Sequence, residues 1–329
     1  MRSEGMLSAW THNSDKIRQS IPDFVFNPSD PWTVTFQAGL ERAELTGRRV
    51  YEVGIGSGAN VVFMLRRCGA SLVMGSDVDP RLQTLARRLV TEVAPDLLDR
   101  FRPIQGSVNL IDIPEAIAEV ALADVVVGCL PQVPDPEGPM YVQFHLAQLK
   151  TMPDLRQRVD DHIAHYYPWS AFNNYPFNSV GLGLIEALLR RVRSCAPRAQ
   201  VVLNLGCRIG KDTLLRLFRA NGYQPEELTS RIVRQSERTD ISFFVALEVA
   251  IRGTGYEKDL VCEFYADSEG RVPISAIKAK ELLDADPTTP VFHEICVLRG
   301  HPQAADMETP KCAANRADSD VTTTEYTSR

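Results

Sequence analysis

The stretch that decides the fold is Val50-Tyr51-Glu52-Val53-Gly54-Ile55-Gly56-Ser57-Gly58-Ala59-Asn60. An apolar run precedes three glycines at alternate positions, and a segment of helical character follows them. Glycine lets the backbone approach a ligand closely, and the amide groups at a helix N-terminus donate hydrogen bonds to ligands. The stretch therefore predicts a strand, a ligand-binding loop formed by Gly54, Gly56 and Gly58, and a helix.

Apolar runs recur along the chain, and stretches of helical period separate them. They lie near residues 49–53, 71–76, 101–105, 123–127 and 201–205. This alternation predicts an α/β fold with a doubly wound parallel sheet.

The later part of the chain has a different pattern. Residues 241–249 (ISFFVALEV) are rich in β-forming types and, with LVCEFYA soon after them, predict an antiparallel hairpin. Residues 274–285 predict a short helix, and residues 291–298 predict one more strand.

The expected organisation has four parts. A helical cap covers residues 1–45, and a ligand-binding domain covers 46–250, with an inserted aromatic lid at about 135–180. A small β/α extension follows over 251–303. Residues 304–329 have few large apolar side chains and are expected to be a disordered tail.

Composition limits the classes of function. The chain has 329 residues, 44% of them hydrophobic, and a net charge of −6, which gives no positive field for nucleic acid or an anionic membrane. Seven cysteines without CxxC spacing predict reduced thiols and a cytoplasmic protein.

His162 and His165 lack a third ligand with suitable spacing, so no metal is expected. We expect a small-molecule substrate and no nucleic-acid or membrane partner, and homo-oligomerisation is left open.

Acidic residues accompany the glycine loop. Glu52 lies at the end of the first predicted strand, and Asp77 ends the second, where a carboxylate can bind both hydroxyls of a ribose. Asp79 is a competing candidate, but the proline after it is typical of a helix N-cap, so Asp77 is preferred. Ser107 and Asn109 follow the third strand and are candidates for contact with an adenine ring.

The acid two residues before the first glycine gives the pattern ExGxGxG. This pattern resembles the first motif of the class I S-adenosylmethionine (SAM) dependent methyltransferases, whereas Rossmann dehydrogenases have GxGxxG. The resemblance implies a Rossmann-like class I methyltransferase fold with a mostly parallel sheet of seven strands. It also implies SAM as cofactor or substrate. SAM is favoured over NAD, and a ligand is favoured over a purely structural turn.

A longer set of motifs resembles the N-terminal domain of methionine S-methyltransferase. The matching stretches, which span about residues 24–267, include DPWTVTF at 30–36, GCLPQ at 128–132, GLGLI at 181–185, NLGCRIG at 204–210 and TDIS at 239–242. The family has an acidic and amide pair before GLGLI, where this chain has PFNSV. It also has Gly-Gly-Arg-Pro-Gly where this chain has GCRIG. These departures imply an altered acceptor pocket.

The GCLPQ segment stands where amine methyltransferases of this fold have Asp/Asn-Pro-Pro-aromatic. Cys129 is a candidate nucleophile, although a small buried side chain is the favoured interpretation. The carbonyl groups of Cys129 or Leu130 are expected to orient a neutral amine, which can lose its proton to water with assistance from Tyr175 or Asn204. Gln132, the last residue of the GCLPQ segment, is a further candidate catalytic residue, as are Cys129 and Leu130. Arg208 fits two interpretations equally, a cofactor-binding residue that pairs in bidentate fashion with the carboxylate in the methionine part of SAM, and a cap of its turn.

Residues 165–177 contain six aromatic side chains besides a histidine, among them Trp169 and Tyr175. They fit equally a hydrophobic lid and a cage for the sulfonium of SAM, in which each cation–π contact contributes about 0.5–2 kcal/mol. The chain also resembles the azetidine-2-carboxylate synthases, which look like methyltransferases but cyclise SAM. From this resemblance, the missing acidic and amide pair and the aromatic segment, we expect intramolecular cyclisation of SAM to azetidine-2-carboxylate with release of methylthioadenosine. S-methyl transfer to methionine or a similar small amino acid is the alternative, and a non-catalytic SAM-binding module is the alternative of another class.

Overall fold

The computed structural model describes residues 29–107, 110–132, 172, 174–236, 240–255 and 258–303. Asn109, His162, His165 and Trp169 lie outside these ranges, as do most of the predicted lid and the predicted tail. The elements are α3 (Pro31–Arg42), β1 (Arg49–Val53), α4 (Ala59–Arg66), β2 (Leu72–Asp77), α5 (Pro80–Val93), η2 (Pro95–Arg100), β3 (Phe101–Gln105), α6 (Pro114–Val120), β4 (Val125–Gly128), η5 (Pro176–Val180), α9 (Gly183–Cys195), β5 (Gln200–Gly206), α10 (Lys211–Ala220), β6 (Tyr223–Arg234), α11 (Ser242–Ile251), β7 (Phe264–Tyr265), β8 (Pro273–Ile274), α12 (Ala276–Ala285) and β9 (Phe292–Pro302).

The strands form one sheet in the order β3-β2-β1-β4-β5-β9-β7-β8, and β6 pairs with β9 as well. Strands β3, β2, β1, β4 and β5 pair in parallel, whereas β9 is antiparallel to both β5 and β6. The described residues form nine strands where seven were predicted, and β7 and β8 contain only two residues each. The predicted class, a Rossmann-like class I methyltransferase fold with a mostly parallel sheet, is confirmed.

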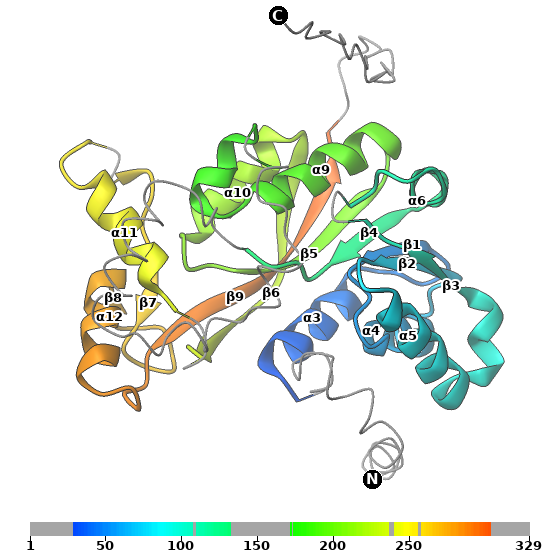
Figure 1. Cartoon of the computed structure of the whole chain (residues 1–329), viewed down its shortest axis with the longest axis horizontal. Helices are drawn as coiled ribbons and strands as arrows, with labels where there is room; N and C mark the ends of the chain where they lie inside the picture. Colours follow the sequence, from blue (N-terminus) through cyan, green and yellow to red (C-terminus); the bar gives the residue numbers. More distant parts are fainter. Residues whose placement is uncertain are drawn as a thin grey trace, which may run out of the picture.

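Helices cover both faces of the parallel strands. Figure 1 shows α3, α4 and α5 on one side of the sheet and α6, α9 and α10 on the other. Neighbouring residues of β1 point to opposite faces, so Val50 belongs to the core under the first group and Tyr51 to the core under the second. Because both faces are buried, the parallel strands are nearly continuous apolar runs, which is why sequence patterns located them.

The part of the predicted N-terminal cap that the structure describes is mainly α3, which packs directly on the sheet. Asp30 begins this helix, because its Oδ2 accepts hydrogen bonds from the amides of Trp32 (3.0 Å) and Thr33 (3.1 Å). Gly39 allows the close approach, since a β-carbon built there would lie 2.5 Å from Cγ1 of Val297 in β9. The helix thus holds Trp32 beside the ends of β5 and β9.

The hairpin predicted from residues 241–249 is wrong, because residues 242–251 form helix α11. Its partner α12 explains the difference. Glu248 of α11 accepts hydrogen bonds from the amides of Ala276 (2.8 Å) and Ile277 (3.1 Å), which begin α12. Tertiary packing and this capping interaction therefore outweigh the β propensity of the aromatic and β-branched residues. The predicted helix at 274–285 and the strand at 291–298 are confirmed within a few residues as α12 and β9.

Strand β6 was not among the predicted strands. Most of its residues are exposed or half-buried, and Tyr223, Leu228 and Val233 are the buried ones. A strand with so few buried positions carries a weak hydrophobic pattern. It is held by an eleven-residue pairing register with β9, which no local pattern reveals.

Candidate active site

The glycine loop connects β1 to α4 at the carboxyl end of the sheet. Gly54, Gly56 and Gly58 have φ values of +78°, +52° and +83°, a left-handed conformation that favours glycine. Gly58 also lies against α5, because a β-carbon built there would be 2.7 Å from Cα of Ala86. Gly58 thus serves the packing of α4 on α5, and Gly54 and Gly56 remain the candidates for close approach of the backbone to a ligand.

Glu52 is a buried carboxyl group under this loop, with 1% of its surface exposed. Its Oε1 accepts a hydrogen bond from Asn60 Nδ2 at 3.2 Å, and its Oε2 has no partner among the described residues. Burial raises the pKa of Glu52 to about 8. A buried acceptor without a partner is costly, so this oxygen is well suited to a ligand hydroxyl or to a cation.

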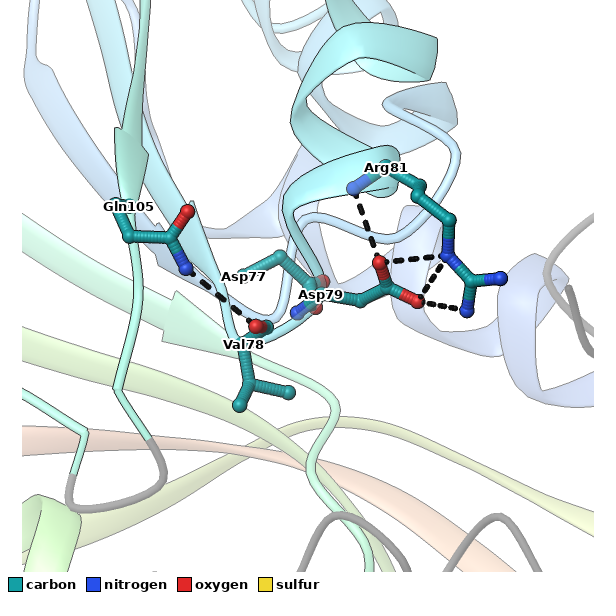
Figure 2. A network of polar contacts seen from close by, with 5 residues as sticks. All are labelled: Asp77, Val78, Asp79, Arg81 and Gln105. Carbon is teal, nitrogen blue, oxygen red and sulfur yellow. Dashed lines mark hydrogen bonds and ion pairs between the residues drawn. The ribbon is translucent and has the colours of Figure 1, made fainter.

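Asp77 ends β2 and faces the same loop. Its Oδ2 accepts from the amide of Gly56 at 3.0 Å and its Oδ1 from the amide of Asp79 at 3.1 Å. Burial raises the pKa of Asp77. Asp79 has a different role, since it begins α5, accepts from the amide of Arg81 at 2.9 Å and forms an ion pair with the Arg81 guanidinium (Figure 2). The structure thus places Asp77, and not Asp79, against the glycine loop.

The end of β3 contributes fewer polar contacts to the candidate site. Gln105 donates to the carbonyl of Val78 at 3.4 Å, which ties β3 to the turn after Asp77 (Figure 2). Ser107, a predicted adenine contact, donates its hydroxyl to Asp112 Oδ2 at 3.1 Å. Asn109 lies outside the described residues.

The GCLPQ segment at 128–132, here called the reaction loop, follows β4. It lies against the glycine loop, because a β-carbon at Gly54 would be 3.2 Å from Cδ2 of Leu130. Gln132 fixes the far end of this loop. Its Nε2 donates to the carbonyl of Gly206 at 2.9 Å, and its Oε1 accepts from the amide of Gly206 at 2.5 Å. The two hydrogen bonds hold the loop to the end of β5.

Asn204 of β5 joins this loop to α3. Its Nδ2 donates to the carbonyl of Trp32 at 3.0 Å and to Sγ of Cys129 at 3.4 Å, and its Oδ1 is a buried acceptor without a partner among the described residues. Although Cys129 is exposed as a residue, protein atoms around its thiol raise the pKa to about 12. The thiol is therefore protonated at neutral pH and unsuited to act as a thiolate nucleophile.

Arg208 lies just beyond β5, and residues that were not predicted surround it. Its Nε donates to Gln235 Oε1 at 2.9 Å, and its guanidinium lies over the ring of Trp32, 5.9 Å from the ring centre. Burial lowers the pKa of Arg208 to about 10, so the group stays charged at neutral pH. The ring of His293 is 6.1 Å from that of Trp32, centre to centre. Of this group, sequence analysis singled out only Arg208, although Trp32 lies within the quoted DPWTVTF motif.

Tyr175 lies just before η5 and α9. The guanidinium of Arg190 lies over its ring at 5.1 Å, and Phe172 contacts it with ring centres 6.1 Å apart. One face of the Tyr175 ring is thus already occupied by a cation from α9. Trp169, the other predicted member of an aromatic cage, lies outside the described residues.

The fold and the site define the class of protein: a Rossmann-like class I methyltransferase fold with its glycine loop, Glu52 and Asp77 at the carboxyl end of the sheet. Within that class the sequence is similar to methionine S-methyltransferases. The protein from Zea mays is 27% identical over 269 residues, which cover 77% of this chain and 23% of the relative. The Hordeum vulgare protein is 26% identical over 287 residues, covering 82% and 24%. The chain therefore spans about a quarter of the length of the curated relatives it matches, and the predicted resemblance is confirmed.

No protein-family model matches the chain. A solved SAM-dependent methyltransferase from Geobacter sulfurreducens, in complex with S-adenosylhomocysteine (SAH), is 14% identical with a TM-score of 0.39, covering 84% of this chain and 93% of that one. Within the described ranges, no helix is long and apolar enough to cross a bilayer. The same residues contain no group of three or more His, Cys, Asp or Glu side chains placed to hold a metal ion.

Proposed function

We propose that this chain is a SAM-dependent methyltransferase that methylates the thioether sulfur of methionine or of a similar small amino acid. The observation that carries the proposal is the joining of two loops at one edge of the sheet. The glycine loop, Glu52 and Asp77 form a nucleoside site, and the reaction loop held by Gln132 and Asn204 lies directly beside it. The similarity to methionine S-methyltransferases supports the choice of acceptor.

The nucleoside half of the site accounts for SAM. The Asp77 carboxylate is placed to accept hydrogen bonds from ribose hydroxyls beyond those it already receives from backbone amides, since each oxygen has two lone pairs. The amides of the glycine loop would face the methionine part of SAM. The buried Glu52 would lie under a ligand that carries a sulfonium charge, and that charge favours its ionised form.

The chemistry of sulfur methylation fits the groups near the reaction loop. A lone pair on the thioether sulfur attacks the methyl carbon of SAM, and the bond between that carbon and the SAM sulfur breaks with its electron pair. The products are a methylsulfonium and SAH, and no proton is released. No general base is needed, in agreement with a loop whose polar side chains are the amides of Gln132 and Asn204 and a protonated thiol at Cys129.

Cyclisation of SAM, the reaction expected from the sequence, remains a prediction. Its products, azetidine-2-carboxylate and methylthioadenosine, differ from those of methyl transfer. It was argued from an aromatic cage that includes Tyr175, and one face of that ring is covered by Arg190. Cyclisation also attacks with an amine, which must lose a proton, whereas sulfur methylation releases none and needs no proton acceptor. Sulfur methylation is therefore preferred.

The test is an incubation with SAM alone and with SAM plus L-methionine, analysed by mass spectrometry. S-methylmethionine and SAH in the second incubation support the proposal. Methylthioadenosine with azetidine-2-carboxylate in the first identifies a cyclase, and binding of SAH without any product identifies a binding module. Calorimetric titration with SAM, SAH and NAD accompanies the incubation, and a preference for NAD would overturn the nucleoside assignment.

A further inference from the structure

Arg208 is a half-buried cation with incomplete pairing. Among the described residues it has no carboxylate partner, and its side chain donates a hydrogen bond from Nε to Oε1 of Gln235. Gln235 is 3% exposed and its Nε2 donates to the carbonyl of Ser236 at 3.2 Å, so its Oε1 is oriented toward Arg208. This arrangement fixes one edge of the guanidinium and leaves the Nη groups for another partner.

The free edge of Arg208 points toward the end of β5. A β-carbon built at Gly206 would lie 3.6 Å from Nη1 of Arg208, 3.3 Å from Oε1 of Gln132 and 3.0 Å from Cη2 of Trp32. The glycine thus allows the guanidinium, the reaction loop and the indole to approach one another closely at this point. Asn204 is two residues earlier in the same strand, so its side chain lies on the same face as this point.

His293 adds a second unpartnered group. It is 1% exposed, and neither ring nitrogen has a hydrogen-bond partner among the described residues. Burial, and next the charge of Arg208, lower the pKa of His293 well below its usual range, so the ring is neutral and has one N–H to donate. A buried donor without a partner costs about 1–3 kcal/mol, which a ligand would offset.

We propose that Arg208, held by Gln235 and Trp32 and joined by His293, binds the carboxylate of the amino-acid acceptor in a subsite separate from that of SAM. The proposal rests on the proposed function. A guanidinium edge beside an N–H matches the planar, singly charged carboxylate, which accepts two parallel hydrogen bonds. Strand β4 separates β5 from β1, so the subsite is about 9–10 Å from the glycine loop across the sheet. The acceptor would extend from Arg208 toward the reaction loop.

The test measures binding in the presence of saturating SAH by calorimetry on the full chain, with L-methionine and methioninol, its analogue without a carboxylate, as probes. We expect Arg208→Met to weaken L-methionine binding at least 30-fold, which corresponds to about 2 kcal/mol. Methioninol binding should change less than threefold, and so should the affinity for SAH. Arg219→Met, at an exposed position near the end of α10, is the matched control and should leave all three affinities unchanged.

Two more variants separate binding from structure. Arg208→Lys keeps the charge but loses the planar fork, and it should weaken methionine binding about tenfold. His293→Phe keeps a ring and removes both nitrogens, and we expect about a fivefold loss of methionine affinity. A purely structural histidine would leave that affinity unchanged while the variant gained stability.

Each outcome is decisive. Equal methionine binding by the parent and both Arg208 variants overturns the subsite, and a parallel loss of SAH affinity overturns its separation from SAM. If the parent binds no SAH, or converts SAM alone to methylthioadenosine, the proposed function itself fails and the subsite with it. If the parent methylates methionine and the Arg208 variants have unchanged methionine affinity, the subsite alone fails.

Discussion

The substitution Gly58→Ala tests why the third glycine of the loop is required. Its φ of +83° is a left-handed conformation that costs an alanine about 1–2 kcal/mol. The added β-carbon would also lie 2.7 Å from Cα and Cβ of Ala86, and such overpacking typically costs about 1–3 kcal/mol. We therefore expect the free energy of unfolding to fall by about 2–5 kcal/mol.

Gly47→Ala provides the matched control. Its φ of +72° carries the same backbone strain, but a β-carbon there would have nothing within 4 Å, so the expected loss is only about 1–2 kcal/mol. Urea unfolding gives both free energies, and the difference between the two variants isolates the contact of α4 with α5. Equal losses would refute the assignment of Gly58 to helix packing. A normal stability for Gly58→Ala with lost SAH binding would instead place Gly58 at the ligand.

The remaining predictions concern acids and amides of the site. Asp77→Asn should weaken SAH binding at least tenfold, whereas Asp79→Asn should lower stability by up to about 1 kcal/mol and change SAH binding less than threefold; the reverse order in calorimetry would exchange their roles. Because the pKa of Glu52 is raised from 4.5 to about 8, the folded, ligand-free protein holds a proton that the unfolded chain releases, so stability falls as pH rises between these values. Glu52→Gln should reduce that slope, which is at most about 1.4 kcal/mol per pH unit for one group, and an unchanged slope in unfolding experiments contradicts the shift. Gln132→Leu removes two hydrogen bonds to Gly206 and should lower the free energy of unfolding by about 1–3 kcal/mol, while a variant as stable as the parent by urea unfolding would show that the loop is held elsewhere.

Sequence patterns singled out the glycine loop, Glu52 and Asp77, which the structure brings together, and the physical reason is local. Strands buried on both faces are apolar runs that are easy to recognise in a sequence. The glycines and acids of the loop lie within a few residues of such a strand, so they can be recognised with it. Asp77 was separable from Asp79 because the proline after Asp79 marks a helix start, and the structure has that helix.

The acceptor half depends on contacts between distant parts of the chain. Trp32 begins α3 and His293 begins β9, yet their rings are 6.1 Å apart. Their meeting requires β9 to pair antiparallel with β5, which no local pattern specifies. The helix α11 was mistaken for a strand for a related reason, since its partner α12 comes about thirty residues later along the chain.

The position of β9 has a consequence for the order in which the protein is made. This strand lies between β5 and β6, although it follows both along the chain, and it carries His293. While the chain emerges from the ribosome, β5 has β4 beside one edge only, and β6 lacks its β9 partner, until residues 292–302 are free of the exit tunnel. These unpaired edges are exposed to other chains during that interval. The proposed acceptor side of the site can therefore form only after β9 is synthesised, whereas the strands β1, β2 and β4 of the proposed nucleoside side are synthesised earlier.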